Sequence, residues 1–413
     1  MENKYTVNVL VEKKVYIIDG ARTPFLKNEG VRGPFSGVDL ALHASRIALR
    51  KSTVPLEDVE EVVLGTVMIE PEEVNPARVL GVRLGVPISS PAYTVQRNCT
   101  SGLDAIDAAR KDILLGKHEV VLCGGTEAMS RAALQYRPKL SDWFTSMAKK
   151  KTVGSKIKHV FKLPLLTAFN PIIALLEGLK DPFHKVLMGV TAENVSNKSQ
   201  IDREDMDYYS VRSHERALSA DFSEEISPMY DRWGKIYETD SGVRSGLTTK
   251  KISKMRAAFT RDGNVTAANS SQITDGSCMM VLASEDYVLR NRIVPIAEII
   301  DIEWSGVDPM EMGIGPVSAI ESLLLLNDVN KEDISHVEIN EAFAGQVLSC
   351  NEKLKFSEDI LNPHGGAIAM GHPIGASLAR LTLHASLNIK GYAIAAGCVG
   401  GGQGGAILLK EIE

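Results

Sequence analysis

Two six-residue stretches share one pattern: Glu57-Asp58-Val59-Glu60-Glu61-Val62 and Glu332-Asp333-Ile334-Ser335-His336-Val337. Each leads from a helix-like segment into an apolar run that is typical of a buried strand. A duplicated α/β chain would produce this recurrence, although six matching residues can also arise by chance. The pattern favours two similar α/β halves on either side of a different middle section, roughly residues 131–272.

Other short segments support an α/β chain. Apolar runs at 15–18, 62–67 and 120–123 each end at or near glycine or a polar residue, as buried strands do. Between Cys99 and Gly116 the apolar residues recur at helical spacing, and Gly116 is the expected stop. Near the C-terminus, residues 376–389 are helix-like and a strand is expected over 391–396.

The composition limits the class of protein. The chain has 413 residues, 44% hydrophobic and 24% charged, with a net charge of −6, which does not favour nucleic-acid binding. Its five cysteines lack Cys-x-x-Cys spacing, so we expect neither a disulfide framework nor a metal site. The N-terminus lacks the apolar core of a secretion signal, and residues 163–179 are too short and interrupted to span a bilayer. We therefore expect a cytoplasmic protein.

The middle section contains an unusual basic stretch. Residues 131–162 hold nine Lys or Arg and one acid, Asp142, with apolar side chains interleaved. A largely apolar stretch, 163–176, follows. Such a basic amphipathic segment can lie on an anionic membrane surface, which would make the protein peripheral to a membrane. The alternatives are a loop with solvated lysines, or one that meets the phosphates of a ligand or an acidic partner.

The chemistry centres on Cys99, in residues 96–103, Gln-Arg-Asn-Cys-Thr-Ser-Gly-Leu. A thiol at the start of a helix is expected to ionise readily, although a lone buried cysteine is more often a small packing residue. Two histidines, His364 and His372, and Cys398 lie in Gly-rich loops far along the chain. We predict that His364 is the general base for Cys99, and a purely structural role for His372 stays open.

Glycine is densest at 397–405, Gly-Cys-Val-Gly-Gly-Gly-Gln-Gly-Gly. The run formally contains G-x-G-x-x-G, but the few residues after it leave no room for a dinucleotide-binding unit. Its backbone amides could instead stabilise an oxyanion next to Cys398. Asn340 follows a predicted strand and could hold a water or polarise a carbonyl, although a lone Asn is often a turn residue.

Together these motifs resemble the thiolase family, and the resemblance covers nearly the whole chain. It includes Ala-Arg-Thr-Pro at 21–24, Met-Gly-Val-Thr-Ala-Glu-Asn at 188–194, Asn-Glu-Ala-Phe-Ala at 340–344 and Cys-Val-Gly-Gly-Gly at 398–402. It implies a duplicated five-layer α/β/α/β/α fold with an inserted loop domain. The implied division is an N-terminal half (13–130 with 273–292), a loop domain (131–272, with the basic insert at 131–176) and a C-terminal half (293–413).

The resemblance also implies roles for individual residues. Cys99 would be the acylated nucleophile, activated by His364, and Cys398 would exchange a proton with the acetyl-CoA methyl group. Asn340 with His364 resembles one oxyanion hole, and the amides of Cys99 and Gly400 resemble another. The positions expected to line the coenzyme A channel are Leu187, Met188, Arg244 and Ser271. Coenzyme A would be a substrate, with no permanently bound cofactor.

The implied reaction is CoA-dependent cleavage of 3-ketoacyl-CoA by ping-pong kinetics, reversible as a Claisen condensation. Leu187 replaces the His usual in short-chain members, and Thr100 replaces a frequent Gly; with the basic insert, these favour a 3-ketoacyl-CoA thiolase of fatty-acid β-oxidation. The alternative is a short-chain acetyl-CoA acetyltransferase. A ketoacyl synthase would lack Cys398, and a non-catalytic lipid-binding relative would lack at least one site residue. The family implies a homodimer or homotetramer, and the insert could contact a fatty-acid-oxidation partner subunit.

Overall fold

The computed structural model describes residues 13–412, and a ten-stranded sheet runs through this part of the chain. The strand order is β12-β13-β14-β11-β1-β10-β5-β3-β4, and the short β2 pairs with β10. The bounds are β1 (Val15–Arg22), β2 (Leu26–Lys27), β3 (Glu61–Gly65), β4 (Ala92–Val95), β5 (Val120–Ala128), β10 (Thr274–Ser284), β11 (Ala297–Gly306), β12 (Ile334–Ile339), β13 (Tyr392–Val399) and β14 (Gln403–Lys410).

The sheet consists of two equivalent halves, which confirms the predicted duplication. The N-terminal order β1-β10-β5-β3 matches the C-terminal order β11-β14-β13-β12, and the halves join where β1 pairs antiparallel with β11. In each half the last pair of this series, β5 with β3 or β13 with β12, is parallel. The two repeated stretches occupy equivalent places, since 3-10 turns at Leu56–Asp58 and Lys331–Asp333 lead into β3 and β12.

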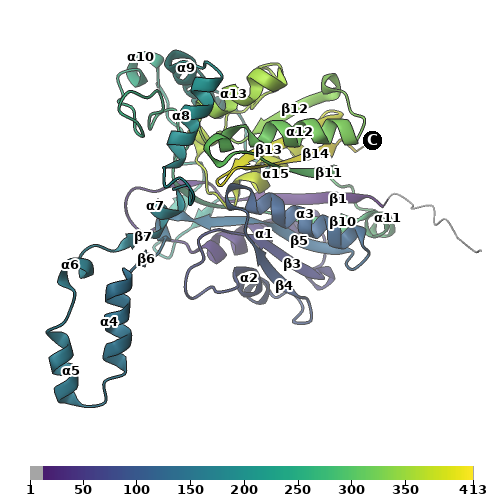
Figure 1. Cartoon of the computed structure of the whole chain (residues 1–413). Helices are drawn as coiled ribbons and strands as arrows, with labels where there is room; N and C mark the ends of the chain where they lie inside the picture. Colours follow the sequence, from purple (N-terminus) through teal and green to yellow (C-terminus); the bar gives the residue numbers. More distant parts are fainter. Residues whose placement is uncertain (1–12, 413) are drawn as a thin grey trace, which may run out of the picture.

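Helices complete the five layers (Figure 1). One apolar core packs α1 (Gly37–Ser52) and α2 (Pro76–Leu84) on the N-terminal half, and another packs α12 (Gly315–Leu326) and α13 (Ala344–Leu354) on the C-terminal half. Between the halves, α3 (Ser101–Leu114) and α15 (Ser377–Leu387) share a core with strands of both. Every residue of α15 except the last, Leu387, is buried, as expected for the central layer. The two helices occupy equivalent positions in the duplicated halves.

The section between β5 and β10 contains a helical hairpin that projects away from the body (Figure 1). Its arms are α4 (Pro138–Ala148) and α5 (Val153–Val160), tied by a 3.0 Å bond from Trp143 Nε1 to the His159 carbonyl. At its base lie β6 (Leu134–Gln135), α6 (Leu165–Ala168), β7 (Ile172–Ile173) and α7 (Ala174–Gly178). In the described part of the chain no helix is both long and apolar enough to cross a membrane.

The rest of this section returns to the body. It comprises α8 (Met188–Lys198), α9 (Arg203–Ser219), β8 (Met229–Tyr230), β9 (Ile236–Tyr237) and α10 (Thr249–Ile252). Both α8 and α9 contact α13 of the C-terminal half. The remaining helices are α11 (Glu285–Asn291) after β10 and α14 (Ala367–Met370) before α15. The predicted domain boundaries remain a prediction.

Candidate active site

Cys99 lies in a single 3-10 turn, Asn98–Thr100, between β4 and the start of α3. Asn98 has a φ of 45°, a left-handed conformation that is uncommon for a residue other than glycine. Its side-chain amide donates a 2.8 Å hydrogen bond to the carbonyl oxygen of Gly400, in the loop between β13 and β14. The strained turn is thus held against the C-terminal half of the chain.

The Cys99 thiol does not ionise readily in this structure, so the prediction from its place at a helix start is wrong. Burial raises its pKa to about 11, and nearby Glu127 adds to this effect. The backbone amides of Gly400 and of Cys99 itself lower the pKa, but burial outweighs them. The thiol is therefore protonated at neutral pH and needs a base. The same two amides are the donors predicted for an oxyanion.

Cys398 is buried near the end of β13, and its backbone pairs with Gly404 across the β13–β14 hairpin. Burial, and then the neighbouring Cys99, raise the pKa of its thiol well above the usual value. The hairpin turns through Gly401 and Gly402, whose φ angles of 97° and 86° require glycine. The structure thus brings the two predicted catalytic thiols together.

Asn340 and His372 form the polar side of the site. Asn340 directly follows β12, and its Nδ2 lies 3.4 Å from His372 Nε2. His372 is buried, and burial lowers its pKa to about 4, so the ring is neutral. Two residues after His372, Ile374 packs in one apolar cluster with Cys99.

The tautomer of His372 follows from its other nitrogen. His372 Nδ1 lies 2.5 Å from the Ser377 hydroxyl, and that hydroxyl donates its single proton to the carbonyl of Pro373 at 3.0 Å. Ser377 can therefore only accept from the ring, which places the proton on Nδ1. The lone pair is left on Nε2, the nitrogen that faces Asn340.

The structure does not bring His364 to Cys99, and this corrects the predicted general base. His364 Nδ1 lies 2.9 Å from His384 Nε2, and burial, followed by the neighbouring His384, lowers the pKa of its ring. Its ring lines a separate surface groove. Both His364 and His372 occur in Gly-rich loops, so sequence context could not separate them. The Ser377 hydroxyl five residues after His372 is the distinguishing feature.

A buried carboxylate that the sequence analysis missed holds this loop in place. Glu341 accepts hydrogen bonds from Tyr209, Ser213 and the backbone amide of Ile368. It also accepts one from Asn362, whose φ of 44° is another left-handed non-glycine conformation. The segment leading to His372 is therefore anchored to α9 and to the end of β12.

A second missed carboxylate, Glu127 at the end of β5, links the two halves. It accepts from the amides of Val67 and Met68 in the N-terminal half and of Gly375 in the C-terminal half, at 2.9–3.0 Å. Burial raises its pKa to about 7. In the sequence, an acidic residue inside a largely apolar strand could have indicated this buried carboxylate.

The residues expected to bind coenzyme A are less closely grouped. Met188 begins α8 and lies against Gly400. Leu187, half-buried, precedes it, and the amide of Ser271 donates to the Ala342 carbonyl beside the Asn340 motif. Arg244 is exposed, and its amide donates to His214 on α9. The structure shows no contact between Arg244 and the catalytic thiols, and the binding roles remain predictions.

An apolar cluster, which we call the Cys99 cluster, surrounds Cys99. Leu175 and Leu179, from the base of the projecting hairpin, pack there with side chains of both halves. Its members besides Cys99 are Val67, Met68, Met129, Ala132, Leu175, Leu179, Ile273 and Ile374. The section that contains the hairpin therefore contributes directly to the surroundings of the Cys99 sulfur.

The fold and the site define a duplicated α/β protein in which two thiols, one from each half, meet beside the backbone of Gly400. The family models that match are "Thiolase, N-terminal domain" over residues 15–286 and "Thiolase, C-terminal domain" over residues 293–411. The chain belongs to the thiolase family and is an acyltransferase.

Individual relatives agree. The chain is 36% identical to the mitochondrial 3-ketoacyl-CoA thiolase of Mus musculus, over 96% of this chain and 98% of that protein. It is also 36% identical to a probable acetyl-CoA acyltransferase of Staphylococcus epidermidis, over 97% and 99%. Among solved structures, human mitochondrial 3-ketoacyl-CoA thiolase in complex with CoA has a TM-score of 0.87 at 33% identity, covering 97% and 98%. An acetyl-CoA acetyltransferase of Bacillus anthracis has a TM-score of 0.87 at 34% identity, covering 97% and 99%.

Proposed function

We propose that the protein cleaves 3-ketoacyl-CoA with coenzyme A, through an acyl group carried on Cys99. The observation that carries this proposal is the meeting of the Cys99 and Cys398 thiols beside the amide of Gly400. The Cys99 thiol suits a nucleophile, because the amides of Cys99 and Gly400 lie beside its sulfur and can donate to an oxyanion formed there. The Cys398 thiol suits proton transfer to and from carbon, because it is buried, neutral and next to Cys99.

In the first half-reaction, His372 Nε2 takes the thiol proton and the Cys99 sulfur attacks the 3-keto carbon. The oxyanion is stabilised by the amides of Cys99 and Gly400. When the bond between C2 and C3 breaks, its electron pair leaves on the acetyl-CoA fragment, and Cys398 protonates that carbon. Asn340 Nδ2 and the protonated His372 are placed to stabilise the enolate oxygen of the fragment.

In the second half-reaction, Cys398, now a thiolate, removes the proton from the thiol of an incoming coenzyme A. The resulting thiolate attacks the acyl group on Cys99 and releases a shortened acyl-CoA. Cys99 leaves as thiolate and recovers its proton from His372. One nucleophile serving two substrates in turn gives ping-pong kinetics.

The substrate class that we favour is 3-ketoacyl-CoA of broad chain length, as used in fatty-acid β-oxidation. It is supported by the apolar Cys99 cluster, which offers an acyl chain a hydrophobic contact surface, and by the relatives named 3-ketoacyl-CoA thiolase. The test is CoA-dependent thiolysis of substrates from acetoacetyl-CoA to 3-ketohexadecanoyl-CoA, followed by loss of the enolate absorbance. Turnover confined to acetoacetyl-CoA would instead support the short-chain acetyltransferase function.

The role of Cys398 has its own test. Cys398→Ser should abolish exchange of the acetyl-CoA methyl protons with deuterated water, because that exchange needs an acid/base group at carbon. Cys99→Ala should abolish acylation as well as cleavage and condensation. If Cys398→Ser exchanged and cleaved at the wild-type rate, the acid/base role would be refuted.

The projecting hairpin favours a peripheral role at an anionic membrane. Its exposed surface combines lysines with apolar side chains, and Phe161, Leu166 and Phe169 are 86%, 92% and 86% exposed. Such side chains can enter the interface while the lysines contact anionic headgroups. The other candidate contact, an acidic fatty-acid-oxidation partner, would use the same lysines.

Liposome binding distinguishes these cases. Replacing Lys149, Lys150 and Lys151 with Gln should weaken co-sedimentation with phosphatidylserine vesicles and spare turnover of acetoacetyl-CoA. The matched control replaces three exposed lysines elsewhere, Lys353, Lys355 and Lys390. Equal binding by both triple variants would refute the membrane role.

Homodimer or homotetramer assembly, tested by light scattering, and cytoplasmic location, tested by fractionation, are further parts of the proposal.

A further inference from the structure

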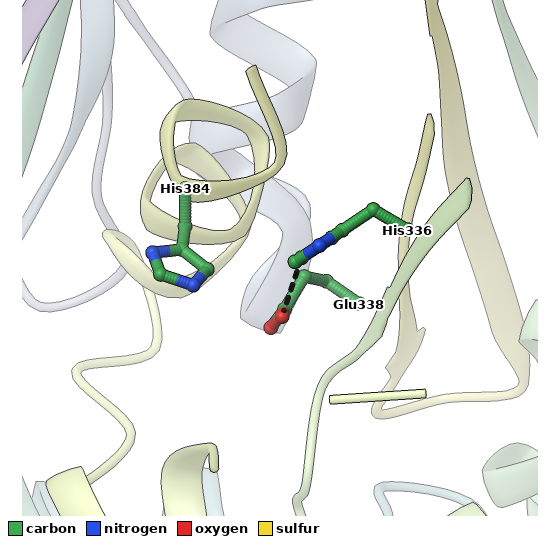
Figure 2. A group of neighbouring side chains, drawn as sticks. All are labelled: His336, Glu338 and His384. Carbon is green, nitrogen blue, oxygen red and sulfur yellow. Dashed lines mark hydrogen bonds and ion pairs between the residues drawn. The ribbon is translucent and has the colours of Figure 1, made fainter. Parts of the chain in front are cut away.

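A second group of titratable side chains lies outside the thiol site, and we call it the histidine cluster. His336 and Glu338 come from β12, His384 from α15 and His364 from the loop before α14. Candidate ligand atoms of the first three lie within 4.8 Å of one another. Figure 2 shows the Glu338 carboxylate between the His336 and His384 rings.

The distances within the histidine cluster approach those of a metal site. His336 Nε2 is 3.0 Å from Glu338 Oε1, and His364 Nδ1 is 2.9 Å from His384 Nε2. Two ligands bound to tetrahedral zinc at about 2.0–2.1 Å lie about 3.3 Å apart. Each close pair therefore needs to open by a few tenths of an ångström. The widest separation among the His336, Glu338 and His384 ligand atoms, which lie within 4.8 Å of one another, needs to close by up to about 1.5 Å.

The outer nitrogen of His384 is oriented as in many metal-binding histidines. His384 Nδ1 lies 2.8 Å from Glu225 Oε2, and Glu225 is held in turn by Arg22 at 2.6 Å. Arg22 Nε donates to the other oxygen of this carboxylate, and a carboxylate accepts a hydrogen bond from Nδ1–H of the ring. The lone pair then lies on Nε2, which faces the cluster, and a carboxylate–histidine pair of this kind strengthens a metal ligand.

Glu338 is incompletely satisfied by its protein neighbours. The residue is fully buried, and among described residues its Oε2 has no hydrogen-bond partner. Arg380 Nη1 is 3.5 Å from that oxygen and also lacks a hydrogen bond. A cation bound among the histidines would give Glu338 Oε2 the partner that it lacks among the described residues.

We propose that the histidine cluster binds a divalent transition metal ion, with Zn²⁺ as the best fit. His336, Glu338 and His384 supply three ligands, and His364 supplies the fourth from the half-buried edge. Three imidazoles and one carboxylate suit zinc better than Mg²⁺ or Ca²⁺. The sequence motifs alone led us to expect no metal, because the ligands come from three separate segments.

The ion would enter through the surface groove that His364 lines, which has a volume of about 370 Å³. Once bound, it would tie β12 and α15 to the loop that leads through α14 to His372. Its expected effect is therefore to stabilise the fold around the thiol site. The proposal does not depend on the thiolase reaction.

The test is a titration of purified protein with Zn²⁺ by calorimetry, together with Co²⁺ absorption in the visible region. Cys99 is first alkylated with iodoacetamide, because its thiol could bind zinc independently. We expect one high-affinity ion per chain, tetrahedral Co²⁺ bands without a thiolate charge-transfer band, and a higher Tm with Zn²⁺. His336→Leu should weaken Zn²⁺ binding at least tenfold and remove the Tm increase.

Glu338→Gln should have the same effect on binding as His336→Leu. The matched control is His43→Gln, which removes a part-buried histidine whose ring contacts a serine hydroxyl and no carboxylate. It should bind like the wild type. If the wild type binds no ion, or if His336→Leu binds as tightly as His43→Gln does, the metal site is refuted. If only Glu338→Gln misfolds, His336→Leu still decides the question.

Discussion

Ser377 fixes the tautomer of His372 through a 2.5 Å hydrogen bond between Ser377 Oγ and His372 Nδ1. The serine hydroxyl is itself committed to the Pro373 carbonyl, so the imidazole must donate. The Nε2 lone pair that the proposed reaction uses is thus set by a residue five positions along the chain, in the first turn of α15.

This relationship predicts the effect of Ser377→Ala. Without the hydroxyl, the proton can occupy either ring nitrogen and the ring loses its orientation, so kcat should fall about tenfold with little change in KM. The pH profile of kcat should also shift. Ser386→Ala is the matched control, because Ser386 lies on the same helix and donates to an i−4 carbonyl at 2.8 Å without touching a histidine.

The two histidines of the Gly-rich loop should differ sharply. His372→Gln should lower kcat for thiolysis about a hundredfold or more, the usual contribution of a general base. His364→Gln should stay within about threefold of the wild type, because its partners belong to the histidine cluster and not to the thiols. Steady-state kinetics on both variants decides the assignment, and the opposite order would restore His364 as the base.

The pKa of Cys99 predicts how the free enzyme reacts with iodoacetamide. Because burial raises that pKa to about 11, the thiolate fraction, and with it the alkylation rate, should keep rising from pH 7 to pH 10. Mass spectrometry of the Cys99 peptide gives the rate at each pH. A plateau reached below pH 8 would show that the helix start controls the thiol after all.

The same shift has a consequence for stability. The unfolded thiol ionises near its ordinary pKa of 9.0, whereas the folded thiol keeps its proton up to about pH 11. The folded state therefore binds more protons in that window, and the free energy of unfolding falls as pH rises through it. Cys99→Ala should remove that part of the decline in a denaturant-unfolding series.

Leu175, buried in the Cys99 cluster, should affect chain-length preference. Leu175→Ala removes apolar contact with the acyl chain, so kcat/KM for 3-ketohexadecanoyl-CoA should fall about tenfold relative to acetoacetyl-CoA, equivalent to about 1.4 kcal/mol. Leu140→Ala is the control, since Leu140 is also buried but lies in α4 of the hairpin. A uniform loss on every substrate would assign Leu175 to folding alone.

Local patterns in the sequence were sufficient to predict the architecture. The helix expected between Cys99 and Gly116 forms as Ser101–Leu114, and the strand expected at 391–396 forms as Tyr392–Val399. Periodicity and glycine stops encode these elements, because they depend on neighbours in the chain.

The predictions that failed depended on contacts between segments that are distant in the sequence. The choice of His364 over His372 required knowing which ring the fold turns toward Asn340, and the pKa of Cys99 required its burial by both halves. Glu127 and Glu341 were overlooked for the same reason, since each acts through backbone amides or hydroxyls from elsewhere in the chain. Burial outweighed the local helix effect that the sequence suggested.

The equivalent helices α3 and α15 place the two partners of the proposed acyl transfer in different copies of the duplicated unit. One copy of the duplicated unit presents its thiol just before α3, and the other presents its imidazole just before α15. Under the proposed mechanism neither unit alone contains a complete reaction centre, so a chain cut between them would regain turnover only when both fragments reassociate. The proposed catalysis thus depends on groups that the two duplicated units do not share.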